Sequence, residues 1–261
     1  KKKITLWGQG ISVKRYIKEE KKPSLLLKWM IGLADNIWFY TEKEKKQWES
    51  VFPLKNMISL GNTISGVENI VSHKSTKSKE QLKKKYSIKQ ERCLIFCARF
   101  NNNFRRQDLL VEIIKQFDAS TYGFIIIGSG EAKPDFSAHN NVYDFGAVYE
   151  EVIKQELFSI ADVYIQPGWV GLSIVEAMAY GKPIVTFQRS ENIFQCVEFS
   201  YLKNGFNALI FKSVQDMKGK FENIHQNEIE TMGINAKNYV NDNLLMKMMI
   251  YKASMYLEEN Y

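Results

Sequence analysis

The chain has 261 residues, of which 45% are hydrophobic and 25% are charged, and this composition excludes disordered, collagen-like and coiled-coil proteins. Its formal net charge of +7 is unevenly distributed, because residues 1–90 carry a net charge of +12 and residues 91–261 a net charge of −5. The length suits one large domain or two of ordinary size, and the uneven charge favours two units.

Short runs typical of β-strands recur along the chain, and we predict strands at 4–7, 37–40, 57–60, 94–97, 124–127, 142–145, 163–166, 183–187 and 208–211. Amphipathic stretches between the later runs predict helices at 107–117, 150–160, 172–180 and 214–224, and residues 228–261 predict two more. Near-continuous apolar strands that alternate with helices indicate parallel sheets joined by right-handed crossovers.

A polar segment rich in lysine and serine, residues 72–85, separates two groups of strands, and we interpret it as a linker that runs into an exposed helix. About three strands precede it, too few for a doubly wound sheet, and about six follow. We therefore predict an α/β fold of two Rossmann-like units. The first, residues 1–75, is incomplete, the second covers residues 76–243, and residues 244–261 form a helix that packs back toward the first.

Residues 25–33 predict an early helix, with Ser24 as its N-cap and several lysines before it. Such a helix can lie on an anionic membrane or be buried against the first sheet. Because it is apolar nearly all round, we favour the buried position.

The cysteines and the chain start bear on cellular location. Three cysteines without CxxC spacing predict buried, reduced thiols. The lysines at 1–3 are not followed by the apolar region of a signal peptide, and no apolar stretch reaches the about 18 residues that a bilayer span needs. We therefore expect a cytoplasmic protein. The lack of an initiating methionine favours a fragment of a longer one.

Two glycine-containing turns follow predicted strands, where backbone N–H groups can bind phosphate. Gly128 and Gly130 lie in the first, and Gly168 and Gly171 in the second. Lys133 stands where the dinucleotide fingerprint needs a third glycine, so a nicotinamide dehydrogenase is disfavoured.

Charged side chains follow the same strand ends. Arg99, Arg105 and Arg106 lie between the strand at 94–97 and the next helix, where cations can pair with a diphosphate, although a surface salt bridge is an alternative. Glu176 lies one turn into the helix at 172–180 and can accept hydrogen bonds from sugar hydroxyls. Its alternative role is to interact favourably with the helix dipole.

Five segments between residues 94 and 211 resemble, in order and spacing, the retaining GT-B glycosyltransferases of family 4, also called group 1. Residues 97–110 resemble G-R-x…K-x-x-D-L-L, 125–131 the l-x-I-x-G-x-G-p-e turn and 143–148 v-x-f-x-G-x-v. Residues 161–167 resemble a-D-v-x-v-x-P, and 171–185 resemble G-l-x-x-x-E-A-m-a-x-G-x-P-V-v. Upstream, residues 7–10, 34–42 and 60–64 look like the second half of the acceptor domain.

The resemblance implies a role for each matching residue. Arg99 and Arg105 would be catalytic and would bind the donor diphosphate with the N–H groups of Gly171 and Leu172, while Glu176 would hold the ribose. The remaining donor-binding positions are Gly128, Gly130, Gly146, Ala147, Val148, Gly168, Trp169 and Val170. Gly8, Gln9 and Gly10 would face the acceptor. The resemblance implies no metal, and the sequence has neither an Asp-x-Asp motif nor histidines at ligand spacing.

Three departures from the family pattern matter. Gly168 stands where relatives often carry the first Glu of a Glu-x7-Glu pair, in a loop similar to the subset with P-G-x-v-G-l. Gln9 replaces a histidine of W-G-H-G. The loop after Arg99 is one residue longer than usual, so either Arg105 or Arg106 can take the second cationic position.

The expected function is transfer of a sugar, with retention, from a nucleoside diphosphate-sugar to a glycan or lipid-linked acceptor in bacterial surface polysaccharide synthesis. Alternatives are a nucleotide-sugar 2-epimerase of GT-B fold and a nucleotide-binding fragment without turnover. A nucleic-acid binder is disfavoured, because no RNP, KH or helix-turn-helix pattern occurs. The basic first unit favours, at most, peripheral contact with an anionic membrane at its inner face.

Overall fold

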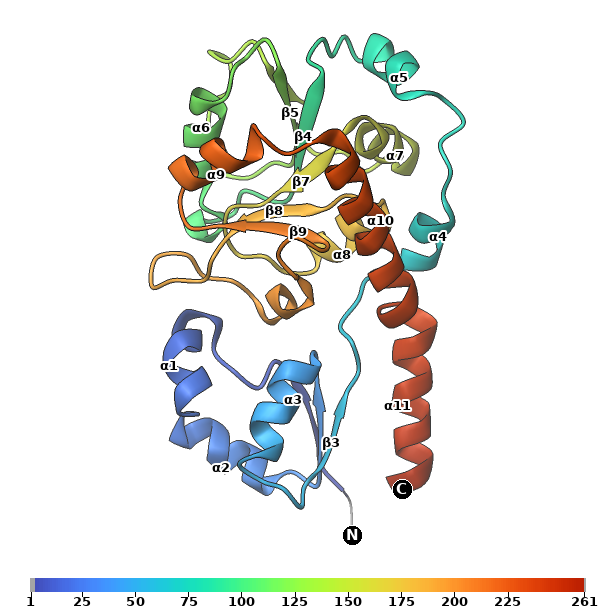
Figure 1. Ribbon diagram of the computed structural model, residues 1–261. Coiled ribbons are helices and arrows are strands. Elements are labelled where there is room, and N and C mark those ends of the chain that lie inside the picture. The colour runs from blue at the N-terminus through green and yellow to red at the C-terminus, as the bar shows by residue number, and fades with distance from the viewer. Residues whose placement is uncertain (1–2, 261) are drawn as a thin grey trace.

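The computed structural model describes residues 3–260 and contains two parallel sheets, one above the other in Figure 1. The smaller sheet consists of β1 (Thr5–Gly8), β2 (Asn36–Phe39) and β3 (Asn56–Ser59), in that order. The larger has the order β6-β5-β4-β7-β8-β9. Its strands are β4 (Arg92–Cys97), β5 (Tyr122–Ile127), β6 (Val142–Asp144), β7 (Val163–Ile165), β8 (Ile184–Phe187) and β9 (Ala208–Phe211). All nine predicted strands are present, each within two residues of its predicted bounds.

The order of the larger sheet reverses beside its central strand. From β4 the chain proceeds outward through β5 and β6, and then crosses back to β7 on the other side of β4. In open parallel sheets, ligands bind outside the carboxyl ends of the strands at such a reversal. The segments after β4 and β7 therefore form the expected binding edge.

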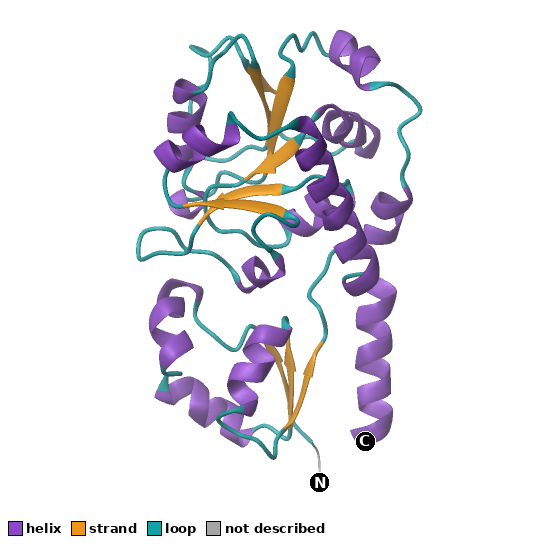
Figure 2. Ribbon diagram, in the orientation of Figure 1, coloured by secondary structure: helices purple, strands orange, loops and turns teal. Residues whose placement is uncertain are grey.

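Helices cover both faces of the larger sheet, as Figure 2 shows. Adjacent residues of β4 point to opposite faces: Ile95 packs with α7 (Glu151–Ile160) and α8 (Ser173–Ala179), and Phe96 with α6 (Gln107–Gln116) and α9 (Val214–Phe221). Burial on both faces explains why these strands are continuously apolar rather than alternating. The four predicted helices at these positions are confirmed.

The connection between the sheets contains α4 (Val67–Ser72) and α5 (Lys79–Lys85). Ser78 and Gln81 form a capping box that starts α5. The prediction that this helix is exposed is only partly right, because Leu82 is fully buried and the helix packs on α7. A single apolar residue in a lysine-rich helix is enough to anchor it.

The two predicted C-terminal helices are present as α10 (Gln226–Asn243) and α11 (Met246–Asn260). Helix α10 packs on α8, whereas α11 continues down to the smaller sheet (Figure 1). There the Tyr256 ring meets Trp38 edge-on, with 6.3 Å between ring centroids, and its hydroxyl donates to Asn36 Oδ1. The last helix thus contacts the first unit directly.

Helices α1 (Tyr16–Lys21), α2 (Leu25–Leu33) and α3 (Glu42–Glu49) accompany the smaller sheet. The Ser24 hydroxyl caps α2 as predicted, accepting from the Leu27 N–H at 3.3 Å. Burial of α2 against the sheet is wrong, because only Ile31 is buried while Leu25 is 80% and Trp29 64% exposed. A helix on one face of a three-stranded sheet can bury only one stripe. None of the helices from residue 3 to 260 is long and apolar enough to cross a membrane.

All three thiols are free, and Cys93 and Cys196 are buried. Burial raises the pKa of Cys93 to about 11 and that of Cys196 to about 12. Thiols in this state are poor nucleophiles, so we assign them to packing.

Candidate functional site

Two buried glutamines fix the loop that follows β7. The Gln166 amide donates to Trp169 O at 2.6 Å and to Gly168 O at 3.2 Å, while its oxygen accepts from Tyr164 and Ser173 hydroxyls. Gln195 Oε1 accepts from the Val170 N–H at 2.8 Å. A buried amide whose oxygen and nitrogen both form hydrogen bonds makes the backbone that it contacts rigid. We call residues 166–172 the donor loop, after the role that the family resemblance implies for it. The sequence did not single out either glutamine, although a polar residue ending an apolar strand was a usable signal.

The donor loop is locked against the turn at Asn103–Arg105. Trp169 has φ 54°, unusual for a bulky residue, and its ring stacks on Phe104 with 4.8 Å between centroids. The Gly168 N–H donates to Arg105 O at 3.2 Å. A Cβ on Gly168 would lie 2.6 Å from Phe104 O and 2.9 Å from Arg106 Cγ. This position therefore has no space for the glutamate that the family pattern suggests.

The two consecutive arginines have different surroundings. Arg106 donates from Nε and Nη2 to the Asp108 carboxylate at 2.8 and 2.6 Å, and from Nη1 to Asn192 O at 3.0 Å. Arg105 is half-buried and has no side-chain acceptor within the described part of the chain. Burial raises the pKa of the Cys97 thiol, at the end of β4, and the nearby charge of Arg105 opposes that rise. Unlike Arg106, Arg105 is thus a cation that remains free at the binding edge.

Arg99 also follows β4, and it is exposed and without an ionic partner among residues 3–260. The backbone on either side of Arg99 packs closely against the glycines after β5. A Cβ on Gly128 would lie 2.0 Å from Ala98 O, and one on Gly130 would lie 2.5 Å from Phe100 O. Both glycines have positive φ values near 145°. Their close approach to residues 98–100 is a structural reason for glycine at both positions.

Glu176, on α8, forms an ion pair with Lys154 on α7, with 2.5 Å between Oε1 and Nζ. Both side chains are largely shielded, at 16% and 27% exposed. Burial alone would lower the pKa of Lys154, but the hydrogen bond and charge of Glu176 raise it above its usual value. The sequence did not point to Lys154, because the two residues lie on different helices.

The other predicted positions lie around this edge. Gly146 has φ 64° and its carbonyl accepts from the Gly128 N–H at 2.6 Å, while Ala147 is exposed and Val148 half-buried. Gly8 ends β1, and Gly10, with φ 69°, packs on Phe39. Gln9 lies between them, half-buried.

The structure brings most predicted donor residues to one edge and leaves the acceptor set on the other unit. Arg99, Arg105, the donor loop and Glu176 all follow β4 or β7. Gly8 ends β1, Gln9 and Gly10 follow it, and the next residue, Ile11, packs against Val197 of the second unit. Among the described residues, no group of three or more His, Cys, Asp or Glu side chains could hold a metal ion.

The model of the family described as glycosyl transferases group 1 matches residues 91–227, which is more than half of the chain. The chain belongs to this family. The match covers both the donor loop and the arginines after β4. No curated protein sequence matches the chain.

Several solved structures have the same fold as this group 1 glycosyltransferase. TarM has a TM-score of 0.63 at 16% identity, over 88% of this chain and 45% of TarM. A sucrose-phosphate synthase from Thermosynechococcus elongatus has a TM-score of 0.71 at 13% identity, over 97% of this chain and 67% of the synthase. Anabaena Alr3699/HepE, in complex with UDP and glucose, has a TM-score of 0.68 at 13% identity, over 97% of this chain and 71% of Alr3699/HepE. The predicted α/β GT-B fold is confirmed, and the chain spans less than half of TarM.

Proposed function

We propose that this chain transfers a sugar from a nucleoside diphosphate-sugar to a glycan or lipid-linked acceptor, with retention and without a metal. The observation that carries the proposal is a free, half-buried arginine, Arg105, at the carboxyl ends of β4 and β7, beside a locked loop and a paired glutamate. Cations fixed at that edge suit a diphosphate leaving group.

The departing diphosphate is stabilised by Arg99 and Arg105 together. As the bond between the sugar's anomeric carbon and the phosphate oxygen breaks, negative charge develops on that oxygen, and fixed cations stabilise it without reorganising. The N–H groups of Gly171 and Leu172 have no acceptor within the described chain and supply two further donors. Gly168, Trp169 and Val170 shape the pocket by their backbone rather than through a carboxylate.

The nucleoside is assigned to the other side of the same edge. Glu176 accepts hydrogen bonds from the ribose hydroxyls, and Lys154 positions its carboxylate through the 2.5 Å ion pair. Gly146, Ala147 and Val148 line the base, and Gly128 and Gly130 keep Arg99 in place. UDP is the first nucleotide to test, because Alr3699/HepE was solved with it.

Glu176→Ala is expected to weaken the binding of the nucleoside diphosphate by about tenfold, because charge-assisted hydrogen bonds to ribose are lost. Isothermal titration calorimetry with UDP and GDP measures this. Glu91→Ala, which removes an exposed carboxylate far from the edge, serves as the control and should bind normally. Unchanged affinity for both nucleotides in Glu176→Ala and in Arg99→Ala would refute the site.

Product analysis distinguishes transfer from its alternatives. Release of nucleoside diphosphate with transfer or hydrolysis of the sugar supports the proposal, and retention is read from the anomeric configuration of the product. A sugar inverted at carbon 2 would assign the chain to an epimerase. Nucleotide binding without any turnover would assign it donor recognition alone.

The acceptor side is proposed to face an anionic membrane in bacterial surface polysaccharide synthesis, which places the protein at the inner face of the membrane. The support is α2, whose exposed Leu25, Leu26 and Trp29 lie next to lysines at 18, 21, 22 and 28. Apolar side chains flanked by cations suit an interfacial helix. Co-sedimentation with anionic vesicles, absent with neutral vesicles and in Trp29→Glu, tests this contact.

A further inference from the structure

A cavity of about 230 Å³ opens between the two units, and none of the residues assigned above to donor binding lines it. One wall is formed by residues 13–18, which follow β1, and the other by residues 189–194, which follow β8. Its lining carries a single carboxylate, Glu191, and four cations: Lys14, Arg15, Lys18 and Arg189.

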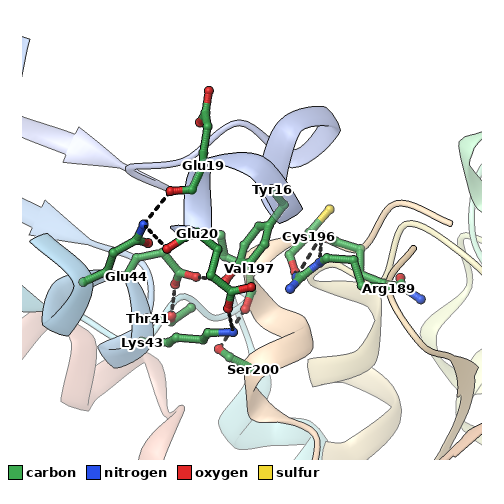
Figure 3. A network of polar contacts seen from close by, with 12 residues as sticks. Tyr16, Glu19, Glu20, Thr41, Lys43, Glu44, Arg189, Cys196, Val197 and Ser200 are labelled. Atoms are coloured by element: carbon green, nitrogen blue, oxygen red, sulfur yellow. Dashed lines mark hydrogen bonds and ion pairs between the residues drawn. The ribbon is translucent and has the colours of Figure 1, made fainter. Parts of the chain in front are cut away.

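The carboxylates behind this lining are already engaged. Glu19 pairs with Arg15 at 2.8 Å, and Glu20 pairs with Lys43 at 2.5 Å. Glu44 is fully buried, accepts the Tyr16 hydroxyl at 2.5 Å, and has its pKa raised by burial. Figure 3 shows the contacts of Glu20 with Lys43 and of Glu44 with Tyr16.

Three of these cations, Lys14, Lys18 and Arg189, form no ion pair with an acidic side chain within residues 3–260, although the charges of Glu20 and Glu44 act on Arg189 from behind the wall. Cations that form no ion pair and gather around a concave space are the pattern of an anion-binding site. The exposed Glu191 offsets only part of it.

Arg189 is held rigidly for such a role. Its guanidinium carbon lies 3.4 Å from the centroid of the Tyr16 ring, and its nitrogens donate to Gln195 O at 3.1 Å and Cys196 O at 2.9 Å (Figure 3). Stacking on an aromatic face fixes the plane of the guanidinium. Because Nε and Nη2 donate to these two carbonyls, Nη1 is the nitrogen that has no acceptor among the described residues and can donate to an anion.

The cavity wall is continuous with the donor loop. The Phe194 carbonyl accepts from the Trp169 N–H at 2.6 Å. Phe104 stacks on Trp169, and Lys14 Nζ lies 4.6 Å from the centroid of the Phe104 ring. A ligand in this cavity would therefore lie alongside the loop that shapes the sugar pocket.

We propose that this cavity binds the phosphate or diphosphate group of an anionic acceptor, with Lys14, Lys18 and Arg189 as its contacts. That the anion is an acceptor rests on the proposed transfer function, whereas the existence of an anion-binding site does not. The phosphate can belong to a sugar phosphate or to a lipid headgroup, because both present the same oxyanion.

The test uses the whole chain with its donor site saturated by UDP, so that a second anion is seen separately. Glucose 1-phosphate and soluble dihexanoyl phosphatidic acid represent the two phosphate sources, and glucose is the neutral probe. The Lys14→Glu/Lys18→Glu double variant should bind the phosphate probes at least about tenfold more weakly. The Lys14→Glu/Lys21→Glu variant has the same net charge as the first double variant but keeps Lys18. Its affinity for the phosphate probes should therefore fall clearly less.

Three results would overturn the site. They are equal affinity for glucose and glucose 1-phosphate, an equal loss of affinity for the phosphate probes in both double variants, and binding of these probes that UDP abolishes. Preference for one phosphate probe identifies the source. UDP affinity, measured in a separate titration, should be the same in wild type and both variants. Failure of UDP to bind wild type would refute the donor site instead, and the phosphate titrations can then be repeated without UDP.

Discussion

Arg105→Ala is expected to weaken UDP binding by about tenfold or more and to slow donor turnover by about a hundredfold, because a preorganised cation at the leaving diphosphate is lost. The guanidinium has no internal partner, so its removal leaves no buried charge behind in the described chain. Titration calorimetry and release of nucleoside diphosphate measure the two effects. Thermal unfolding should be little changed.

Arg106→Ala is the matched control, since it removes the same group one position along. Its guanidinium is already occupied by Asp108 and Asn192, so we expect UDP affinity to change by no more than about twofold. A small loss of stability is the expected effect. A larger loss of UDP affinity in Arg106→Ala than in Arg105→Ala would reverse the assignment.

Gly168→Glu, which restores the family's usual glutamate, is expected to lower the free energy of unfolding by about 3 kcal/mol and to leave turnover no higher. Its Cβ would lie 2.6 Å from a backbone carbonyl, which cannot move without displacing the turn at Asn103–Arg105. Urea unfolding followed by circular dichroism measures the loss.

Gly219→Ala provides the comparison for that substitution. Gly219 is exposed on α9, with no atom within 4 Å of the added Cβ, so alanine should be neutral or stabilise by up to about 1 kcal/mol. If Gly168→Glu were as stable as wild type and bound donor sugar more tightly, the loop would be open at position 168. Sugar orientation would then not depend on backbone groups.

Local sequence patterns were enough to predict most of the secondary structure and the position of the binding edge. Apolar runs and amphipathic periods are set by neighbouring residues, so the strands and the helices of the second unit followed directly from them. The family motifs then identified the donor edge, because parallel strands place their carboxyl ends together. Helix α3 was missed since Trp48 is its only buried apolar side chain.

Only the tertiary structure decided which side chains remain free to act. Arg105 and Arg106 are neighbours of the same type, and they differ because only Arg106 donates to Asp108 and to Asn192, the second of which is 86 positions away. The Glu176–Lys154 pair, the closed space at Gly168 and the cationic cavity also join segments distant in the chain. Contacts of this kind depend on packing between elements, whereas sequence periodicity reports only the face that each element buries.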